Sequence, residues 1–262
     1  MTRAYIALRN NVKERIESVM DGCRSIGLDP VHVSGPVYPA RNSICIAWNR
    51  HLASGTCADA VEREGGRVIV MENGYCGKDS AGRQYYALAR DQHLGAGRWF
   101  PQDDDSRWRA LGIELKPWRT AGTHILVCES RGFGSARTQM PNGWRDKIRR
   151  ELQTWTSRPI RFRSHPAARG VSGVCDLADD LKDAHAVVIW ASNAGTAALI
   201  AGVPVVACFG QWLLQGACGN AIQDVDRPNM PDRRPAFVRL SWAQWTLDEI
   251  ATGFPIARLL ES

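Results

Sequence analysis

Five small or polar residues follow the apolar run AHAVVIWA. The run predicts a buried parallel strand, and the small-residue segment after it predicts a helix. The first turn of such a helix presents unpaired N–H groups and the positive end of the helix dipole, which together attract anions. Ser192 and Asn193 can cap this turn. Ala194 and Gly195 allow a phosphate to approach the backbone, and Thr196 can add a hydroxyl. The pattern predicts a diphosphate site; the alternative is that the polar residues only cap a core helix.

A second group of polar side chains lies on the strand-like segment RPIRFRSHP. Arg161, Arg163 and His165 alternate along it and therefore share one face, and Pro166 ends the strand. We expect His165 to donate a hydrogen bond to a phosphate oxygen, with Arg163 and Pro166 beside it. A histidine before a proline can also be purely structural; the neighbouring helix N-terminus favours the binding role.

The loop ESRGFGSARTQ follows another strand-like segment, THILVC. Gly132 and Gly134, on either side of Phe133, permit close approach of the backbone to a ligand. Arg131 or Arg137 can neutralise a departing diphosphate, whose charge must be stabilised when no metal does so. We expect no tightly bound cofactor, and the sequence leaves the need for a divalent metal open.

Strand-like and helix-like segments alternate along the chain, which predicts an α/β fold with parallel sheets covered by helices. The expected strands are AYIALRN, PVHVSG, NSICIAW, RVIVMEN, THILVC, RPIRFR, AVVIW and PVVACFG. The expected helices cover residues 12–25, 54–64 with Ser54 as N-cap, 83–92, 144–154, 177–183 and 193–201. Residues 101–122, with proline near both ends, predict a linker.

The two halves predict two Rossmann-like domains that face one another across a cleft, onto which the carboxyl ends of both sheets open. The expected boundaries are 1–118 for the first domain and 119–240 for the second. Residues 241–262 predict a helical segment that packs back toward the first domain.

The segment RFRSHP is followed by LADDLKDAHAVVIWASNAGTAALIAGVPVV. In this order the two segments resemble the nucleotide-sugar-binding domain of GT-B glycosyltransferases, over residues 123–209. The first half is similar to these enzymes in architecture alone. The resemblance implies that the donor diphosphate is bound by His165, Ser192, Asn193, Gly195 and Thr196. Related enzymes often use a glutamate to contact the donor ribose, and the segment GQWLLQGACGN has no carboxylate in that place.

Sugar transfer with inversion needs a base that deprotonates the acceptor hydroxyl. The resemblance implies that this base lies in the first, acceptor-binding domain, at a strand end that faces the cleft. Glu72 in VIVMENGY is the expected base, with His51, Asp91 and His93 as alternatives. A carboxylate at a strand end can also simply be solvated.

Arginine and lysine alternate with tryptophan in GRWFPQ, SRWRALG and KPWR. These segments contribute Arg98, Trp99, Arg107, Trp108 and Arg119, which together can grip double-stranded DNA while an acceptor base enters the cleft. Taken singly, each fits a solvated helix or a buried tryptophan. By size, fold and basic character the chain resembles phage-type DNA-modifying glycosyltransferases. That resemblance implies UDP-glucose as the sugar donor and 5-hydroxymethylcytosine in DNA as the acceptor.

Two alternatives stay open. Capsule-type enzymes, which act on a surface polysaccharide or lipid, resemble the second half almost equally, and a non-catalytic nucleotide-binding module is also compatible. The net charge of +6 does not decide, because anionic membranes attract basic proteins too.

Composition predicts a soluble cytoplasmic protein, in a host cell if a phage encodes it. No apolar run is long enough to span a bilayer, and the N-terminus lacks the layout of a signal peptide. The eight cysteines form no C-x-x-C pair, so we expect buried reduced thiols and no structural metal. The sequence indicates no protein partner.

Overall fold

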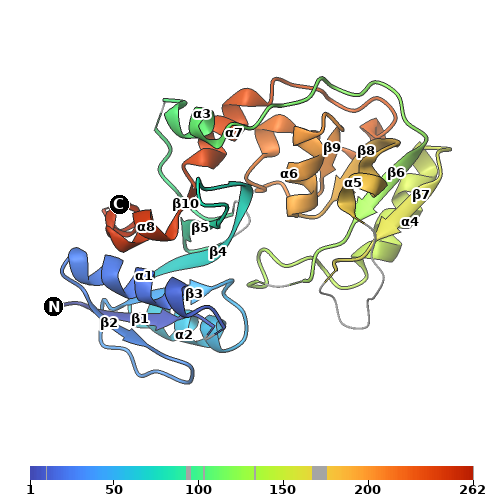
Figure 1. The fold of residues 1–262 in the computed structure, drawn as a ribbon. Helices are drawn as coiled ribbons and strands as arrows, with labels where there is room; N and C mark the ends of the chain where they lie inside the picture. Colours follow the sequence, from blue (N-terminus) through green and yellow to red (C-terminus); the bar gives the residue numbers. More distant parts are fainter. Residues whose placement is uncertain (10, 93–95, 103, 133, 167–175, 262) are drawn as a thin grey trace. The chain divides into compact units, whose positions relative to one another are not determined.

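The computed structural model describes residues 1–9, 11–92, 96–102, 104–132, 134–166 and 176–261 (Figure 1). The chain forms two compact units, which are described separately. The first comprises Met1–Leu111, Phe133–Thr138 and Arg239–Ser262, and the second comprises Gly112–Gly132 and Gln139–Val238. The C-terminal residues therefore group with the N-terminal ones.

A six-stranded sheet forms the centre of the first unit. Its order is β10-β5-β4-β3-β1-β2. The strands are β1 (Arg3–Ala7), β2 (Asp29–His32), β3 (Ile44–Trp48), β4 (Arg67–Lys78), β5 (Gln84–Arg90) and β10 (Gln244–Trp245). Neighbours from β2 through β1 and β3 to β4 are parallel, whereas β5 and β10 run antiparallel to their partners.

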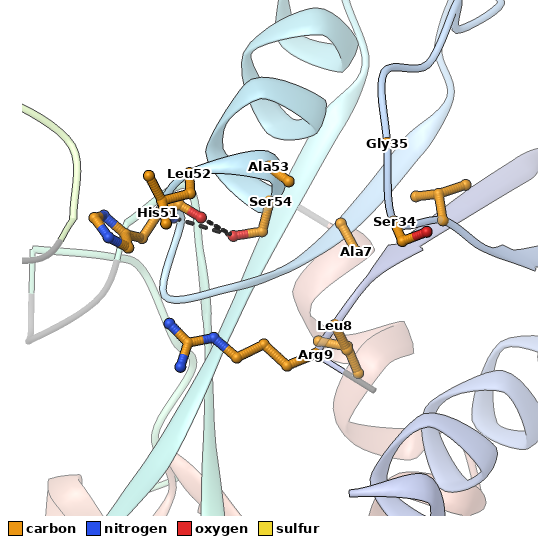
Figure 2. Close-up of a pocket in the computed structure, with 10 residues that line it drawn as sticks. Ala7, Leu8, Arg9, Ser34, Gly35, His51, Leu52, Ala53 and Ser54 are labelled. Atoms are coloured by element: carbon orange, nitrogen blue, oxygen red, sulfur yellow. Dashed lines mark hydrogen bonds between the residues drawn. The ribbon is translucent and has the colours of Figure 1, made fainter. Parts of the chain in front are cut away.

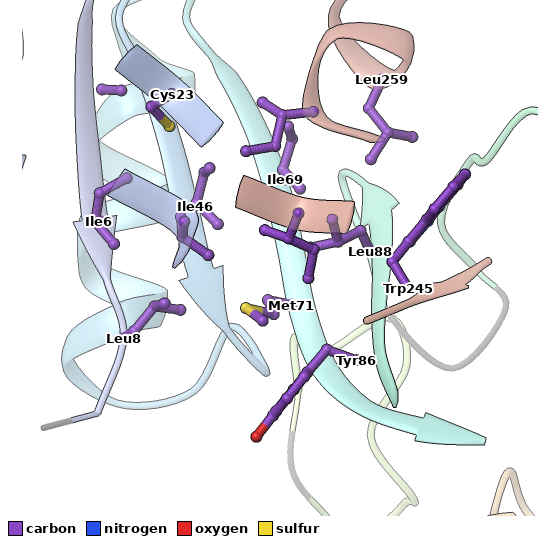
Figure 3. Close-up of a cluster of buried hydrophobic side chains, with 14 of the residues drawn as sticks. Ile6, Leu8, Cys23, Ile46, Ile69, Met71, Tyr86, Leu88, Trp245 and Leu259 are labelled. Atoms are coloured by element: carbon purple, nitrogen blue, oxygen red, sulfur yellow. The ribbon is translucent and has the colours of Figure 1, made fainter. Parts of the chain in front are cut away.

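Helices cover both faces of this sheet. They are α1 (Lys13–Ser25), α2 (Ala53–Arg63), α8 (Leu247–Ala251) and α9 (Phe254–Leu260). The first unit also contains α3 (Ser106–Leu111), and α7 (Arg234–Ser241) crosses the division between the units. On one face Ile6, Ile46 and Met71 pack with side chains of α1, α8 and α9 (Figure 3). On the other face Val68 and Val70 pack with side chains of α2. Successive side chains of a strand point to opposite faces of the sheet. Because helices cover both faces, the side chains on both are apolar.

Residues 83–92 form strand β5 and its end, so the expected helix is wrong. Tyr86 and Leu88 pack on the face covered by α1, while Ala87 and Ala89 are buried on the other face. Because Tyr86–Ala89 are all buried, the segment shows no alternation that would distinguish a strand from a helix.

The start of α2 also differs from expectation. Its N-cap is Leu52, which makes no side-chain cap bond. Ser54, expected as the cap, lies inside the helix, where its hydroxyl donates to the Trp48 carbonyl at 2.7 Å.

The second unit contains a parallel four-stranded sheet of order β7-β6-β8-β9. Its elements are β6 (His124–Cys128), α4 (Trp144–Trp155), β7 (Ile160–Arg163), α5 (Leu177–Leu181), β8 (Ala184–Ile189), α6 (Asn193–Ile200), β9 (Val205–Ala207) and the short 3-10 helices η1 (Gln215–Ala217) and η2 (Ile222–Asp224). Ile125, Val188 and Val206 form a core with Ile148 of α4. The predicted α/β class with parallel sheets is confirmed. Among the described residues, no helix is long and apolar enough to cross a membrane.

Candidate functional site

The strand order of the second unit reverses between β6 and β8. From β6 the chain passes through α4 to β7 on one side, and from β8 it passes through α6 to β9 on the other. Ligands of open parallel sheets bind outside the carboxyl ends of the strands at such a point. The segments that leave these ends, 129–132, 164–166 and 190–192, contain much of the predicted phosphate site.

Ser192 is the N-cap of α6, as predicted. Its backbone is extended, with φ −155° and ψ 145°, and its hydroxyl accepts a hydrogen bond from the Ala194 amide at 3.2 Å. Asn193, the first helical residue, is exposed, and Ala194 is half-buried. The predicted cap is confirmed, and phosphate binding by this turn stays a prediction.

Gly195 and Thr196 have different surroundings from those expected. A Cβ atom on Gly195 would lie 2.5 Å from Ile189 and 2.9 Å from the ring of Trp212, so the glycine makes room for protein side chains and not for phosphate. Thr196 is fully buried, and its hydroxyl has no hydrogen-bond partner among the described residues. A ligand at the surface cannot reach that hydroxyl in this conformation. The part of the turn open to an anion is therefore Ser192–Ala194.

His165 lies just beyond β7 and is half-buried, with exposed Pro166 after it. Burial lowers the pKa of His165 below its usual value, and the positive charges of Arg131 and Arg163 lower this pKa further. The imidazole is therefore neutral at neutral pH and retains one N–H donor. Arg131, which is exposed, is close enough for its charge to act on His165. The segments that follow β6 and β7 therefore lie close together at the carboxyl end of the sheet.

Arg163 is engaged within the protein, contrary to the expectation that it contacts the donor. Its guanidinium forms an ion pair with Asp180 of α5, and its side chain is only 11% exposed. Sequence reasoning missed the carboxylate of Glu129, which accepts from Arg145 at 2.5 Å and from the Ser164 hydroxyl at 3.0 Å. Its position directly after the strand THILVC was the signal that could have identified it. Glu129 therefore ties the start of α4 to the end of β7.

The glycine loop after β6 is divided between the units. Gly132 and Gly134 adopt φ values of 67° and 116°, which favour glycine. Gly132 groups with the second unit and Gly134 with the first, where the Ser135 hydroxyl donates to Gln92 at 2.7 Å. Phe133 lies outside the described residues. Of the loop residues expected to bind the donor, Arg131 and Gly132 are thus assigned to the second unit.

A cavity of about 310 Å³ lies in the first unit, where the strand order reverses between β1 and β3. It is lined by Ala7–Arg9, Val33–Gly35 and His51–Ser54, which follow β1, β2 and β3 (Figure 2). Figure 2 shows the Arg9 and His51 side chains extending toward the same side. Of these residues the sequence suggested only His51. The rule that ligands bind at strand-order reversals could have found the others.

The loop before α2 holds an unusual backbone conformation. Asn49, Arg50 and Leu52 have φ values of 53°, 47° and 52°, a region that residues other than glycine rarely adopt. Buried Arg50 fixes the loop through ion pairs with Asp59 and Glu62 of α2. Such strain is maintained where the surrounding structure determines it, often at a functional site. The loop thereby fixes the cavity wall that carries His51.

Glu72, the expected base, does not line this cavity. It lies within β4, which continues to Lys78 instead of ending near Glu72. Its carboxylate is buried and accepts a hydrogen bond from the Tyr75 hydroxyl at 2.6 Å. Burial, and then the charge of Glu72, raise the pKa of Tyr75. The position fits a structural carboxylate better than one that meets an acceptor.

Asp91 lies far from Glu72 along the β4–β5 hairpin. Its amide bonds to the carbonyl of Val68, and four residues of strand, or about 13 Å, separate Val68 from Glu72. The Asp91 carboxylate accepts from Arg98 at 2.8 Å. One of the alternative bases and one of the expected DNA-binding cations therefore pair with one another. His93, the last alternative, lies outside the described residues.

Arg107 and Trp108 are structural, contrary to the DNA-binding expectation. Arg107 forms an ion pair with Glu249 at 2.5 Å and lies over the ring of Trp245, 4.1 Å from its centroid. Trp108 is only 5% exposed. Neither side chain is available to a nucleic acid.

Arg119 and Trp99 are also engaged internally. Arg119 donates to the carbonyls of Leu181 and Ala184 in the second unit. Trp99 donates to the carbonyl of Arg239 at 3.2 Å in the first. The Arg and Trp pattern thus reflects internal packing, because guanidinium groups satisfy carbonyl oxygens and cover aromatic rings.

The cysteines of the described residues are free thiols, seven in number, and Cys175 lies outside those residues. Burial raises the pKa of Cys128 and of Cys208 to about 12, so both are protonated at neutral pH. Within the described part of the chain, no three His, Cys, Asp or Glu side chains gather in a way that could hold a metal ion.

Comparison with solved structures identifies sugar transferases of similar fold. The chain superposes on Thermosulfurimonas dismutans KpsC, a beta Kdo 2,7 transferase, with a TM-score of 0.53 and 13% identity, over 98% of this chain and 100% of that one. It superposes on the beta Kdo 2,4 transferase of the same organism's KpsC with a TM-score of 0.52 and 11% identity, over 90% and 89%. No protein-family model matches the sequence, and no curated protein does. At these identities the likeness establishes the fold alone.

Proposed function

We propose that this chain is a glycosyltransferase that moves a sugar from a nucleotide sugar to a carbohydrate acceptor. One observation carries the proposal: the Ser192-capped start of α6 lies at the strand-order reversal of a parallel sheet, where neutral His165 and Arg131 also lie. The fold shared with two sugar transferases supports it.

In this proposal the second unit binds the donor and stabilises its leaving group. Negative charge accumulates on the phosphate oxygen as the bond between sugar and phosphate breaks. The positive end of the α6 dipole, the His165 N–H and the Arg131 guanidinium can stabilise that charge. The proposal assigns the counter-charge to Arg131, whose charge acts on His165, whereas Arg163 is paired with Asp180.

The first unit supplies the acceptor site and the base. We assign the base to His51, because it lines the cavity whereas Glu72 is buried against Tyr75. A histidine can accept a proton near neutral pH, which suits deprotonation of a hydroxyl during transfer. Arg9, which lines the same cavity, can orient an acceptor hydroxyl or acidic group.

A carbohydrate acceptor replaces the DNA acceptor expected from the sequence. The expectation relied on Arg107, Trp108 and Arg119, whose side chains are used inside the protein. The similar structures are those of Kdo transferases, which favours the polysaccharide alternative. UDP-glucose and hydroxymethylated DNA are retained as arms of the assay.

The donor half is tested by thermal shift and calorimetry with UDP-, GDP- and CMP-sugars. A nucleotide sugar at 100 times its Kd should stabilise the fold by about 2.7 kcal/mol. Asn193→Asp, which places a carboxylate at the exposed start of α6, should weaken binding of that ligand. The control is Gln153→Glu, which adds the same charge at an exposed position of α4. If no nucleotide sugar stabilises the protein, the proposal is wrong.

The transfer half is tested with labelled donor and three acceptors: an oligosaccharide library, hydroxymethylated DNA and plain DNA. We expect label on the carbohydrate alone. His51→Asn should abolish turnover and preserve donor affinity, whereas Glu72→Gln should retain turnover. If Glu72→Gln abolished turnover and His51→Asn retained it, the base would be reassigned to Glu72. Label on hydroxymethylated DNA would favour the DNA acceptor instead. Donor binding without transfer to any acceptor would indicate a non-catalytic module.

A further inference from the structure

A second cavity, of about 340 Å³, lies wholly within the second unit and has no part in the site described above. Its walls include Trp144, Lys147 and Glu151 of α4, Trp190 after β8, and Asn220 and Gln223 near η2. We name it the Trp190 cavity. Its volume is within the range of small-molecule sites in proteins.

The aromatic wall of this cavity is held firmly. The Trp190 ring meets Trp144 edge to face, with centroids 6.5 Å apart, and lies 5.6 Å from the ring of Phe209 at a tilt of 33°. Trp190 is half-buried and lines the cavity. Clustered aromatic rings of this kind provide a rigid apolar platform whose negative face attracts the C–H bonds on one face of a sugar ring.

Polar groups at the rim both donate and accept hydrogen bonds. Lys147 and Glu151 stand one turn apart on α4, and neither forms an ion pair within 4.0 Å among the described residues. The exposed amides of Asn220 and Gln223 face them from the η2 side. This set suits hydroxyl groups, each of which can donate and accept. Lys147 and Glu151 carry opposite charges that offset one another, so the cavity lining favours an uncharged ligand.

The cavity lies beside the predicted phosphate site but on the other face of the sheet. Val188 and Trp190 pack on the face covered by α4, whereas Ile189 contacts Gly195 of α6. Trp190 precedes the Ser192 cap by two residues, so their Cα atoms can be no more than about 7 Å apart. The backbone of Trp190 therefore lies close to the start of α6, while its ring packs on the face covered by α4.

We propose that the Trp190 cavity binds an uncharged pyranose ring of the reactants, an inference that rests on the proposed function. The ring stacks on Trp190, and its hydroxyls bond to Glu151, Asn220 and Gln223. The same chemistry would recognise the donor's sugar or a unit of the acceptor chain, and the experiment separates these sources.

The test follows the indole N–H signals of the ¹⁵N-labelled full chain by NMR, with Trp190→Phe used to assign the Trp190 signal. The probes are methyl glycosides of glucose, galactose and mannose, a nucleotide sugar, its free nucleotide and inorganic phosphate. A methyl glycoside that shifts the Trp190 and Trp144 signals supports the proposal with the acceptor as source. A shift with the nucleotide sugar but not with its free nucleotide supports it with the donor as source.

Variants of the rim sharpen the test. Asn220 and Gln223 are both exposed. Asn220→Ala and Gln223→Ala should each raise the Kd for the sugar about fivefold, because each removes one hydrogen bond. The control is Gln153→Ala, an exposed residue of α4 that does not line the cavity. A response to phosphate alone, or to none of the sugars, overturns the inference. Nucleotide binding without any response at Trp190 would defeat only this inference, whereas absence of nucleotide binding would defeat the proposed function.

Discussion

The affinity of this protein for a nucleotide sugar should rise as the pH falls from 7.5 to 5.5, because His165 is held neutral in the free protein. Burial acts first to lower its pKa, and the charges of Arg131 and Arg163 act in the same direction. In the proposed donor site, a bound phosphate should reverse the sign of the local potential and raise the pKa of His165. Binding is then coupled to uptake of a proton between the free and bound pKa values.

The size of the effect follows from that linkage. One proton taken up per ligand corresponds to a change of about tenfold in Kd per pH unit, or about 1.4 kcal/mol, within that window. The sign for the unliganded fold is the opposite. A histidine with a depressed pKa binds fewer protons when folded than when unfolded, so stability is present above the unfolded value of about 6.5 and is lost as the pH falls below it.

Isothermal titration calorimetry in two buffers of different ionisation enthalpy measures the proton uptake directly. The nucleotide sugar is the right probe, since its bridging phosphates do not titrate in this range whereas a terminal phosphate has a pKa near 6. His165→Asn should keep a hydrogen-bond donor and abolish the pH dependence, with His32→Asn in the first unit as a control. Proton release on binding, or a pH dependence that survives His165→Asn, would refute the reasoning.

Three further predictions concern the described packing. In thermal or urea denaturation, Ser192→Ala should lower the free energy of unfolding by about 1 kcal/mol, because it removes the N-cap hydrogen bond. Ser192→Asp should largely retain that stability, and an unchanged midpoint for Ser192→Ala would contradict the cap. Gly195→Ala should destabilise by about 1–3 kcal/mol because its Cβ would meet Ile189 and Trp212, and Gly216→Ala, whose Cβ would meet open space, serves as the comparison in the same melts. Arg107→Ala should cost about 1–3 kcal/mol by removing the partner of Glu249, while exposed Arg109→Ala should cost less than about 1 kcal/mol; equal effects in urea unfolding would argue against an internal role for Arg107.

The parallel strands could be predicted from the sequence, because buried strands such as Ile44–Trp48 and Ala184–Ile189 are short apolar runs that alternate with segments of helical pattern. The same property made β5 resemble a helix, since four successive buried residues carry no period. The Ser192 cap was predictable because it depends on local geometry. By contrast, the ion pairs of Arg163 and Arg107 join residues far apart in sequence, so composition could not distinguish a structural arginine from one available to a ligand.

The return of residues 239–262 to the first sheet affects how the protein is made. Gln244, on the last strand, accepts from the amide of Tyr75 and donates to the carbonyl of Cys76, so the edge of the N-terminal sheet is completed by the final residues of the chain. During translation the second unit therefore emerges from the ribosome before the first can close. At about 5–20 residues per second, the early strands wait many seconds with an open edge and are the stage most exposed to misassembly.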